Sequence, residues 1–400
     1  MIFRKDGKEL MSVQKVSTQE LVETGIAESR ESNLLSIEVE DWKFLLEING
    51  TSKASISTEK RGSFTLVHFN FPSGPLGEYH ISAQQPFVDI HRSWTGTIQC
   101  WKGLEMTSVA LNFSFESAGN SSIPVICNYN REGLNRNVLG ILDQKPSTKI
   151  NQRPILEVAP IQVLQTMFTR SRKNGGFRET LVIYQGKQHF AEAVKKFLKF
   201  IKHIQNISPL PAPEWAFKPV WCSWYSHLYK FTQSDLEEQI PFLKKLGIGT
   251  VLVDASWFQS SCTGVGCINE SGEYAMNKDM FPDFKGLAKK IHEAGLKLML
   301  WCAPMQIGKR SRIRKRMEPY CVLKGQERTI VLCPFCKESK DHARKNVERM
   351  MRDYELDGIK LDFIDQGGAE CNDPAHDHGD GNTGAAVIDF LKYIRDGILK

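Results

Sequence analysis

The spacing of apolar residues changes once along this chain, near residue 185, and this change constrains the fold more than any other feature. Before it, apolar and polar residues alternate, as in Val67–Phe71 (VHFNF) and Val109–Phe115 (VALNFSF). Such alternation buries one face of a strand and leaves the other in solvent. Turn-forming clusters such as Pro72–Pro75 (PSGP) separate these runs. The first part of the chain is therefore predicted to be an antiparallel β-sandwich.

A helix and a proline-rich segment follow the alternating region. Apolar residues recur at helical spacing between Lys187 and His203, and Ser208–Pro213 (SPLPAP) then holds three prolines, which stiffen the backbone. A chain of 400 residues also exceeds what one hydrophobic core usually organises. We therefore expect a β-sandwich domain with its exit helix over residues 1–205, a linker over 206–215 and a second domain over 216–400.

Strands and amphipathic helices alternate after the linker. The predicted parallel strands are Trp221–His227, Thr250–Trp257, Lys297–Pro304 and Gly358–Asp365. The helices before the last three strands end near Gly247, Gly295 and Gly358, and glycine adopts the left-handed conformation at no steric cost. No Gly-x-Gly-x-x-Gly follows a strand, and polar and aromatic residues gather at the strand ends, which favours a barrel over an open nucleotide-binding sheet.

The number of predicted units sets the fold class. A complete (β/α)8 TIM barrel takes about 250 residues and eight strands, whereas the predicted second domain holds four strands and stops within a helix. We therefore expect a multidomain β and α/β protein. Its N-terminal antiparallel β-sandwich is followed by a TIM barrel truncated after about four βα units, the first half of a catalytic barrel.

The segment Asp357–Phe363 (DGIKLDF) carries the most specific chemistry. Side chains two apart on a strand point the same way, so Lys360 and Asp362 share one face. A neighbouring ammonium group favours an ionised carboxylate, which is the form that attacks the anomeric carbon of a sugar. We therefore predict Asp362 as a catalytic nucleophile. The alternative is a buried ion pair that only braces the barrel.

Further candidates lie at the ends of the other predicted strands. Asp254 could accept hydrogen bonds from sugar hydroxyls or could cap the following loop. Trp257, Trp301 and Tyr225 offer ring faces on which the C–H groups of a sugar pack, although alternate residues of barrel strands also fill the interior. We predict all four, together with Lys360, as substrate-binding residues.

Cysteine and histidine suggest a competing metal site. Four thiols, Cys262, Cys267, Cys333 and Cys336, could hold zinc if their loops meet. The spacing of the first pair is loose, however, and His376–His378 (HDH) is more typical of a polar loop, so no metal is predicted. No feature calls for a cofactor.

Composition and the N-terminal segment exclude several classes. Lys plus Arg number 52 against 46 Asp plus Glu, and the densest run, Lys309–Arg316, is more typical of a solvated helix face than of a nucleic-acid surface. The start MIFRKDGKEL lacks a signal-peptide core, and no run reaches the length of a bilayer-spanning helix. We expect a cytoplasmic protein whose 10 cysteines are reduced, with no nucleic-acid or membrane partner.

Four sequence blocks, in order, resemble glycoside hydrolase family 36, the melibiase-like α-galactosidases and α-N-acetylgalactosaminidases. They are Ser223–His227 (SWYSH), Val253–Phe258 (VDASWF), Phe281–Trp301 with its ends FPDFKGLA and GLKLMLW, and Lys360–Asp362 (KLD). The resemblance implies a β-sandwich before the barrel, Asp362 as nucleophile, and Lys360 and Asp254 as ligands of the terminal sugar. It also implies an acid/base carboxyl well after the nucleophile, which we expect beyond residue 400.

The resemblance yields a prediction of function. We expect an enzyme, a retaining α-glycosidase that hydrolyses terminal α-linked galactose-type sugars of oligosaccharides or glycoconjugates through a covalent intermediate on Asp362, in a possible homo-oligomer. The family's usual second aspartate is Ala255 here, which removes one acceptor for galactose hydroxyls. Hydrolysis of an α-N-acetylgalactosaminide or α-galactosaminide, or transglycosylation, therefore stays an alternative. A non-catalytic carbohydrate-binding relative is the alternative from another class.

Overall fold

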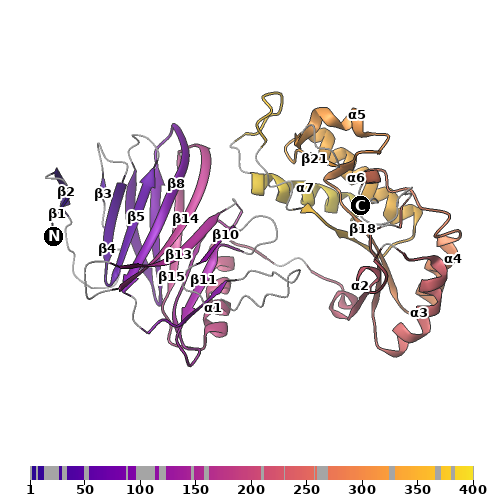
Figure 1. The fold of residues 1–400 in the computed structure, drawn as a ribbon, viewed down its shortest axis with the longest axis horizontal. Coiled ribbons are helices and arrows are strands. Elements are labelled where there is room, and N and C mark those ends of the chain that lie inside the picture. Colours follow the sequence, from indigo (N-terminus) through magenta and orange to yellow (C-terminus); the bar gives the residue numbers. More distant parts are fainter. Residues whose placement is uncertain are drawn as a thin grey trace. The chain divides into compact units, whose positions relative to one another are not determined.

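The computed structural model describes two separate compact units, the first of which ends at Ser208 (Figure 1). The residues described are 2–5, 8–12, 27–28, 34–48, 54–86, 89–95, 113–116, 123–145, 148–156, 162–208, 211–228, 230–255, 257–258, 269–323, 329–364, 371–379 and 383–399.

Two antiparallel sheets form the first unit. The six-stranded sheet has the order β10 (Phe113–Glu116), β13 (Lys149–Leu156), β14 (Gln162–Asn174), β8 (Pro75–Pro86), β5 (Trp42–Ile48) and β4 (Leu34–Val39). The seven-stranded sheet has the order β3 (Ala27–Glu28), β6 (Ser55–Arg61), β7 (Phe64–Phe71), β15 (Phe177–Tyr184), β12 (Asn135–Ile141), β11 (Val125–Tyr129) and β9 (Arg92–Thr95). A separate hairpin joins β1 (Ile2–Lys5) to β2 (Lys8–Ser12).

The core of this unit lies between the two sheets. Phe44 and Ile81 of the six-stranded sheet share one buried cluster with Phe69 and Leu181 of the seven-stranded sheet. In β7, the apolar residues of the predicted alternation are buried and His68 between them is half-buried. The predicted antiparallel β-sandwich is therefore confirmed. Of the predicted strand Val109–Phe115, only the end falls within described residues, in β10.

Helix α1 (Phe190–Ile204) covers the outer face of the seven-stranded sheet. Ala193, Val194, Phe197 and Ile201 form its buried stripe at the spacing of an amphipathic helix. These residues pack against Val138 and its neighbours on β11, β12 and β15. The helix predicted from this periodicity is therefore present, with ends shifted by one to three residues.

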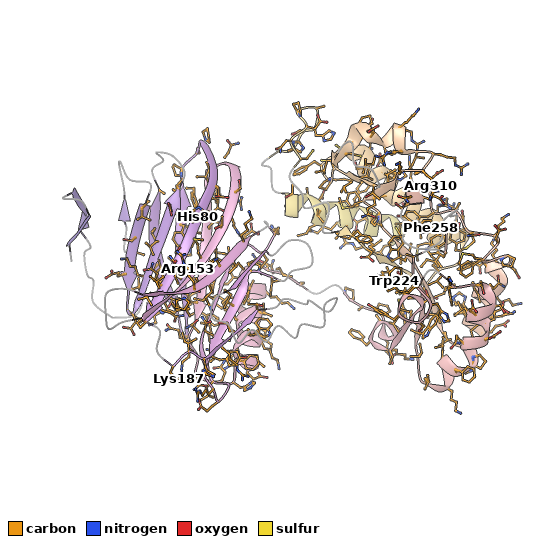
Figure 2. All side chains as sticks on the ribbon, viewed as in Figure 1. His80, Arg153, Lys187, Trp224, Phe258 and Arg310 are labelled. Atoms are coloured by element: carbon orange, nitrogen blue, oxygen red, sulfur yellow. The ribbon has the colours of Figure 1, made fainter. Side chains whose placement is uncertain are left out.

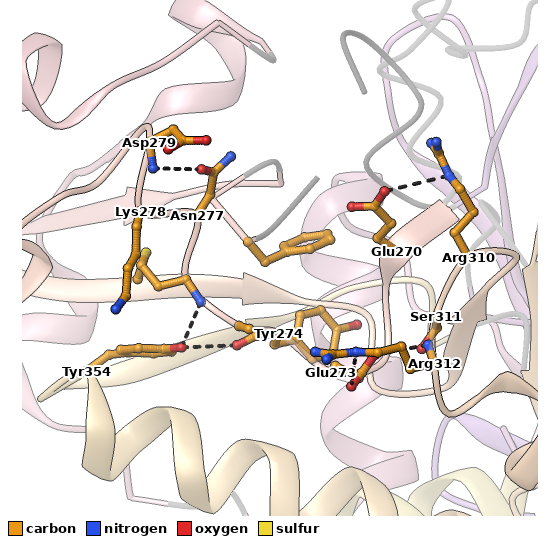
Figure 3. A pocket seen from close by; sticks show the side chains of 13 residues that line it. Glu270, Glu273, Tyr274, Asn277, Lys278, Asp279, Arg310, Ser311, Arg312 and Tyr354 are labelled. Atoms are coloured by element: carbon orange, nitrogen blue, oxygen red, sulfur yellow. Dashed lines mark hydrogen bonds and ion pairs between the residues drawn. The ribbon is translucent and has the colours of Figure 1, made fainter. Parts of the chain in front are cut away.

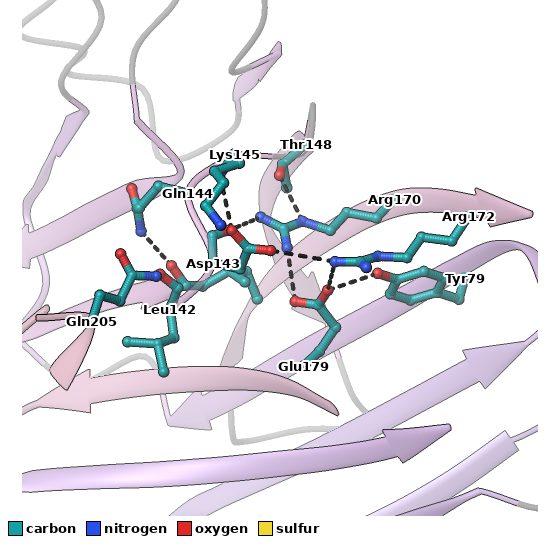
Figure 4. A network of polar contacts seen from close by, with 11 residues as sticks. Tyr79, Leu142, Asp143, Gln144, Lys145, Thr148, Arg170, Arg172, Glu179 and Gln205 are labelled. Atoms are coloured by element: carbon teal, nitrogen blue, oxygen red, sulfur yellow. Dashed lines mark hydrogen bonds and ion pairs between the residues drawn. The ribbon is translucent and has the colours of Figure 1, made fainter. Parts of the chain in front are cut away.

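A charged network is buried within the sandwich (Figure 4). Glu179, with a side chain that is fully buried, accepts from Arg170 Nη1 at 2.7 Å, from Arg172 Nη2 at 3.2 Å and from the Tyr79 hydroxyl at 3.1 Å. Burial raises the pKa of Tyr79, so its hydroxyl keeps the proton that it donates. Arg170 Nε donates to Thr148 Oγ1 at 2.8 Å. One buried carboxylate thus accepts hydrogen bonds from two guanidinium groups and a phenol.

A four-stranded parallel sheet forms the centre of the second unit. Its order is β16 (Val220–Cys222), β17 (Thr250–Val253), β18 (Lys297–Cys302) and β22 (Gly358–Leu361). Before, between and after these strands the chain forms η2 (Glu214–Phe217), α2 (Ser223–His227), α3 (Gln233–Lys245), α4 (Phe284–Glu293), α6 (Lys337–Asp353) and α7 (Thr383–Ile398). Side chains from α3, α4, α6 and α7 share one buried cluster with the strands. This is the predicted succession of βα units, and the fold class is confirmed.

Every predicted strand of this sheet is shorter than expected, and the first is partly wrong. Residues 223–227 form helix α2, because the chain turns directly after Cys222. The second strand ends at Val253 and the fourth at Leu361, one residue before an aspartate in each case. Each of the two strands thus ends directly before one of the predicted site residues, Asp254 or Asp362.

Two of the three predicted glycine turns have the expected backbone conformation. Gly247 after α3 and Gly295 after α4 have φ angles of 72° and 78°. At the third turn, Glu355 has a φ of 54° and Gly358 is instead the first residue of β22. The prediction placed the turn three residues too late, because the left-handed residue after α6 is Glu355 and not a glycine.

A small insertion follows β18 and was not predicted. It holds a three-stranded antiparallel sheet of β19 (Gln306–Gly308), β21 (Thr329–Leu332) and β20 (Cys321–Leu323), with α5 (Arg314–Met317) and η4 (Glu318–Tyr320) between them. The cationic run Lys309–Arg316 lies here, and only its last part is helical. Among the described helices, none combines the length and the apolarity that crossing a bilayer requires.

Candidate active site

Three charged side chains meet at the carboxyl ends of the parallel strands. Lys360 Nζ lies 2.8 Å from Asp254 Oδ2 and 3.3 Å from Asp362 Oδ2. Asp254 is 3% exposed, whereas the side chains of Lys360 and Asp362 are 36% and 37% exposed. The buried Asp254 therefore holds the ammonium group of Lys360, and Asp362 stays accessible on one side. We call these three residues the charged triad.

Strand register brings the charged triad together. In the sheet, β17 pairs in parallel with β18, and β18 pairs with β22, where Trp301 lies beside Lys360. Asp254 follows β17 directly and Asp362 follows β22 directly. Because the carboxyl ends of parallel strands share one edge of the sheet, residues far apart in sequence meet there.

The backbone fixes one oxygen of each aspartate. The amide of Ala255 donates to Asp254 Oδ1 at 2.8 Å, and the amide of Phe363 donates to Asp362 Oδ1 at 2.9 Å. In both cases Oδ2 is left to face Lys360. The two carboxylates are thus oriented by the same local interaction, an aspartate that bonds the next amide after the strand ends.

Neighbouring side chains complete the hydrogen bonds of the two aspartates. Trp301 Nε1 donates to Asp362 Oδ2 at 2.8 Å. Cys222 Sγ donates to Asp254 Oδ2 at 3.4 Å, and the amide of Asp254 donates to Ser223 Oγ at 2.9 Å. Burial raises the pKa of Cys222 to about 11, so the thiol keeps its proton. Cys222 and Ser223 were not among the predicted site residues, although both stand where β16 ends.

Lys360 stays a cation in this setting. Burial alone would lower its pKa, but the hydrogen bond to Asp254 and the negative charges of Asp254 and Asp362 outweigh burial. The net pKa of Lys360 is therefore raised above its ordinary value. A fixed ammonium group beside Asp362 favours the ionised carboxylate that a nucleophile needs.

The predicted aromatic residues have different positions from those expected. Trp257 is 1% exposed, and its Nε1 donates to the carbonyl of Trp301, so its ring belongs to the core and cannot face a sugar. Trp301 is also 1% exposed and reaches the site only through its bond to Asp362. Tyr225 lies on α2 and is 82% exposed. The predicted sugar-stacking role is therefore withdrawn for Trp257, and Trp301 is a positioning residue.

A cavity of about 920 Å3 lies elsewhere in the second unit (Figure 3). Phe258 and Arg310, labelled in Figure 2, both line it. Glu270, which pairs with Arg310, and Glu273, which pairs with Arg312, line it too. The charged triad is not part of its lining. Phe258 stacks on Trp301, which bonds Asp362, so aromatic rings lie between this cavity and the nucleophile candidate. The chemically reactive side chains therefore lie at the strand ends and not in this cavity.

The second feature with ligand-type side chains is a cluster of thiols and imidazoles. Cys333, Cys371, His376 and His378 each place one ligand atom within 4.8 Å of the other three. Of the predicted thiol set, Cys333 belongs to this cluster, while Cys262 and Cys267 lie outside the described residues. The histidine pair, predicted to be only a polar loop, instead packs against buried thiols.

Part of the chain is similar to known proteins. Residues 182–372 match the Melibiase family model. Over 218 residues the chain is 23% identical to an A type blood α-D-galactosamine galactosaminidase from Flavonifractor plautii, covering 49% of this chain and 19% of that protein. Over 151 residues it is 26% identical to the α-galactosidase Mel36A from Lactobacillus acidophilus, covering 35% and 20%. The aligned part is therefore about a fifth of the length of these two relatives.

Solved structures share the fold at low sequence identity. The GH36 α-galactosidase AgaA from Geobacillus stearothermophilus superposes with a TM-score of 0.57 at 15% identity, covering 98% of this chain and 58% of that one. The α-galactosidase TtGalA from Thermus thermophilus, in complex with p-nitrophenyl α-D-galactopyranoside, gives 0.54 at 16% identity, covering 92% and 69%. Together with the fold and the charged triad, the family match and the sequence relatives lead to one conclusion: residues 182–372 carry a melibiase-like region, similar to glycoside hydrolase family 36.

Proposed function

We propose that the protein is a retaining α-glycosidase that acts on terminal α-linked galactose-type sugars, with Asp362 as its nucleophile. One observation carries the proposal. Asp362 is partly exposed, and its Oδ2 lies 3.3 Å from Lys360 Nζ and 2.8 Å from Trp301 Nε1. The side chain is therefore oriented and accompanied by a cation, yet open on one side for the anomeric carbon of a sugar.

The proposed reaction has two displacement steps. In the first, an oxygen of Asp362 forms a bond to the anomeric carbon while the glycosidic oxygen leaves and takes a proton from an acid. In the second, water attacks the same carbon, gives its proton to the base, and releases Asp362. Asp254 is suited to hold Lys360 in place, since it is buried and already bonded on both oxygens. Its predicted contact with a sugar hydroxyl stays a prediction.

A second carboxyl is required as the acid and base. In retaining enzymes it stands about 5 to 5.5 Å from the nucleophile. Asp254 is a poor choice, because a buried carboxylate bound to Lys360 and Cys222 has no access to a leaving group. The acid/base residue beyond residue 400, like the cytoplasmic location and the homo-oligomer, stays a prediction.

A second substrate class is favoured by one position of the site. Ala255 stands directly after Asp254, is 6% exposed and offers no side-chain acceptor. A site with one acceptor fewer makes fewer hydrogen bonds to the hydroxyls of galactose, so its sugar can differ from plain galactose. The sequence relative from Flavonifractor plautii is named for a galactosaminidase activity. α-Galactosaminides and α-N-acetylgalactosaminides are therefore the second candidate substrates.

The test is hydrolysis of p-nitrophenyl glycosides by the full-length protein. We expect turnover of the α-galactoside or of its α-galactosaminide and α-N-acetylgalactosaminide analogues, and none of the matched β-galactoside. Proton NMR of the first-formed sugar should show the α-anomer, because two displacements retain configuration. A first product of β-configuration, or sugar binding without turnover, would contradict the proposal and favour an inverting enzyme or a binding module, respectively.

Replacing the lysine of the charged triad should change the pH profile. We expect Lys360→Met to lower kcat/KM by about 10²–10³-fold, the usual cost of removing one electrostatic contact at a reacting group. Loss of the ammonium group also removes the positive charge beside the reacting carboxylate, so we expect the acidic limb of the kcat/KM profile to move to higher pH. The measurement is kcat/KM against pH for both proteins.

A second lysine on the same strand pair provides the control. Lys297 Nζ lies 2.7 Å from Asp357 Oδ1 at the opposite end of the sheet. Lys297→Met should leave the acidic limb where it is, and Lys360→Arg should restore part of the wild-type profile because it keeps the charge. An unchanged limb in Lys360→Met would remove the proposed role of the lysine.

A further inference from the structure

Two separate segments of the second unit bring four ligand-type side chains together. Cys333 stands in the turn between β21 and α6, and Cys371, His376 and His378 stand in the connection between β22 and α7. Cys333 is 0% exposed, Cys371 is 4% exposed and His376 is 8% exposed. Buried thiols and imidazoles that converge from distant positions form a compact donor set, and loops rarely bury such groups without a partner.

The imidazole of His376 is held in the form that binds metals. Its Nε2 lies 2.7 Å from the carbonyl oxygen of Pro319, and a carbonyl can only accept, so Nε2 carries the proton. Nδ1 therefore presents its lone pair, and it lies 3.2 Å from Cys371 Sγ. A backbone carbonyl that fixes the far nitrogen of a metal-binding histidine is the common second contact of such ligands.

Short turns shape the segment that holds the two histidines. The amide of Ala375 donates to Asp373 Oδ1, and the amide of Gly379 donates to Asp377 Oδ1, both at 3.0 Å. The rings of His376 and His378 are 5.7 Å apart, and the ring of His378 also makes an edge contact with Phe335 beside Cys333. The polypeptide thus positions both imidazoles next to the thiols.

The donor set selects the metal. Two thiolates and two imidazoles in a closed set of four are the ligands of structural zinc, with distances of about 2.3 Å to sulfur and 2.0–2.1 Å to nitrogen. In a tetrahedron with these bonds the ligand atoms lie about 3.4–3.8 Å apart. Because the four ligand atoms lie within 4.8 Å of one another, a shift of about an ångström closes them around an ion.

We propose that Cys333, Cys371, His376 and His378 bind a structural zinc ion. The ion would fasten the connection that follows the nucleophile strand β22 to the start of α6 and, through His376 and Pro319, to η4. All four positions are protein ligands, so no site is open for a substrate, and the ion has no role in the proposed glycosidase chemistry. Its effect is on the stability and order of this connection.

The experiment measures zinc in the reduced full-length protein after removal of loosely bound metal on a weak chelating resin. We expect about one zinc ion per chain in the wild type and much less than that in Cys333→Ser, Cys371→Ser and His376→Gln. The matched control is Cys336→Ser. This thiol stands beside the cluster but outside the four ligands, and as N-cap of α6 it makes no side-chain capping bond, so this variant should keep its zinc.

A second measurement keeps the test valid if a ligand variant does not fold. Wild-type protein stripped with a strong chelator should lose thermal stability and regain it with Zn²⁺ but not with Mg²⁺. Co²⁺ in its place should give the intense visible bands and thiolate charge-transfer absorption of a tetrahedral site. Absence of zinc in the reduced wild type, a disulfide between Cys333 and Cys371, or equal zinc loss in Cys336→Ser would each overturn the proposal.

Discussion

Asp362→Asn is expected to lower the kcat of the full-length protein on its best glycoside by on the order of 10⁴-fold or more, because the amide cannot form the covalent glycosyl intermediate. The substitution is nearly isosteric. The amide of Asn keeps one acceptor, which suffices for the amide of Phe363, but its NH2 group then faces the donors Lys360 and Trp301. Stability is therefore measured together with activity. Steady-state kinetics and a thermal melt of both proteins provide the measurement.

The same strand offers a matched control for this substitution. Asp357 lies just before β22 and bonds Lys297, His292 and the amide of Leu298. Asp357→Asn therefore removes a carboxylate of the same strand at the end away from the site, and we expect a loss of stability with kcat retained. Equal losses of kcat in the two variants would show that the loss comes from removing a negative charge near this strand and not from removing a nucleophile at Asp362.

Chemical trapping separates a nucleophile from a residue that only binds. A 2-fluoro glycosyl fluoride slows both displacement steps but leaves the first one faster, so the covalent ester accumulates. We expect peptide mapping to locate this ester on Asp362. In Asp362→Gly, added azide should take the place of the carboxylate, form its own bond to the anomeric carbon and give a β-glycosyl azide. Labelling of a different carboxylate would withdraw the assignment.

Glu179→Ala should destabilise the β-sandwich by about 3–5 kcal/mol, the usual cost of breaking a buried ion pair from one side. The substitution leaves Arg170, with a side chain that is 1% exposed, without its carboxylate, and removes the acceptor of the Tyr79 hydroxyl. The unpaired buried charge accounts for most of this loss, since the lost packing of the glutamate itself is small. Urea unfolding followed by circular dichroism provides the measurement.

A glutamate at the surface of the same sheet is the control. Glu59 on β6 pairs with Arg61 and His68, and the side chains of Glu59 and Arg61 are 21% and 46% exposed. Glu59→Ala should cost no more than about 1 kcal/mol, as is usual for exposed pairs. Because the chain has two units, the unfolding curves should be fitted with separate transitions. Similar losses in the two variants would mean that the buried network contributes little.

Residue patterns are sufficient to predict the β-sandwich, its exit helix, the four parallel strands and part of the site. Alternation in β7 and helical spacing in α1 report on burial directly, so both elements are predictable. Lys360 and Asp362 are two apart at the end of one strand, so the two-residue repeat by itself places them on one face. Local periodicity is visible in a single segment of sequence.

Contacts between strands are not visible in this way. The bond between Lys360 and Asp254 depends on how β17, β18 and β22 are aligned, and a shift in alignment would separate them without changing any one segment. Burial of Trp257 could not be predicted, because its ring packs against Tyr274 and Tyr354, which come from different segments. The thiol and imidazole cluster joins Cys333 to residues 38 or more positions later, a spacing that matches no compact metal motif.

The bond that each aspartate of the charged triad accepts from the following amide has a consequence for the length of these side chains. A glutamate side chain is one methylene longer, so it cannot accept the same hydrogen bond from the next backbone amide. At position 254 or 362 its carboxylate would lose this orientation, and the oxygen that faces Lys360 would move. Both positions therefore favour aspartate over glutamate, which has the same charge, because of side-chain length alone. The chain itself sets the geometry for attack, and the incoming sugar does not have to create it.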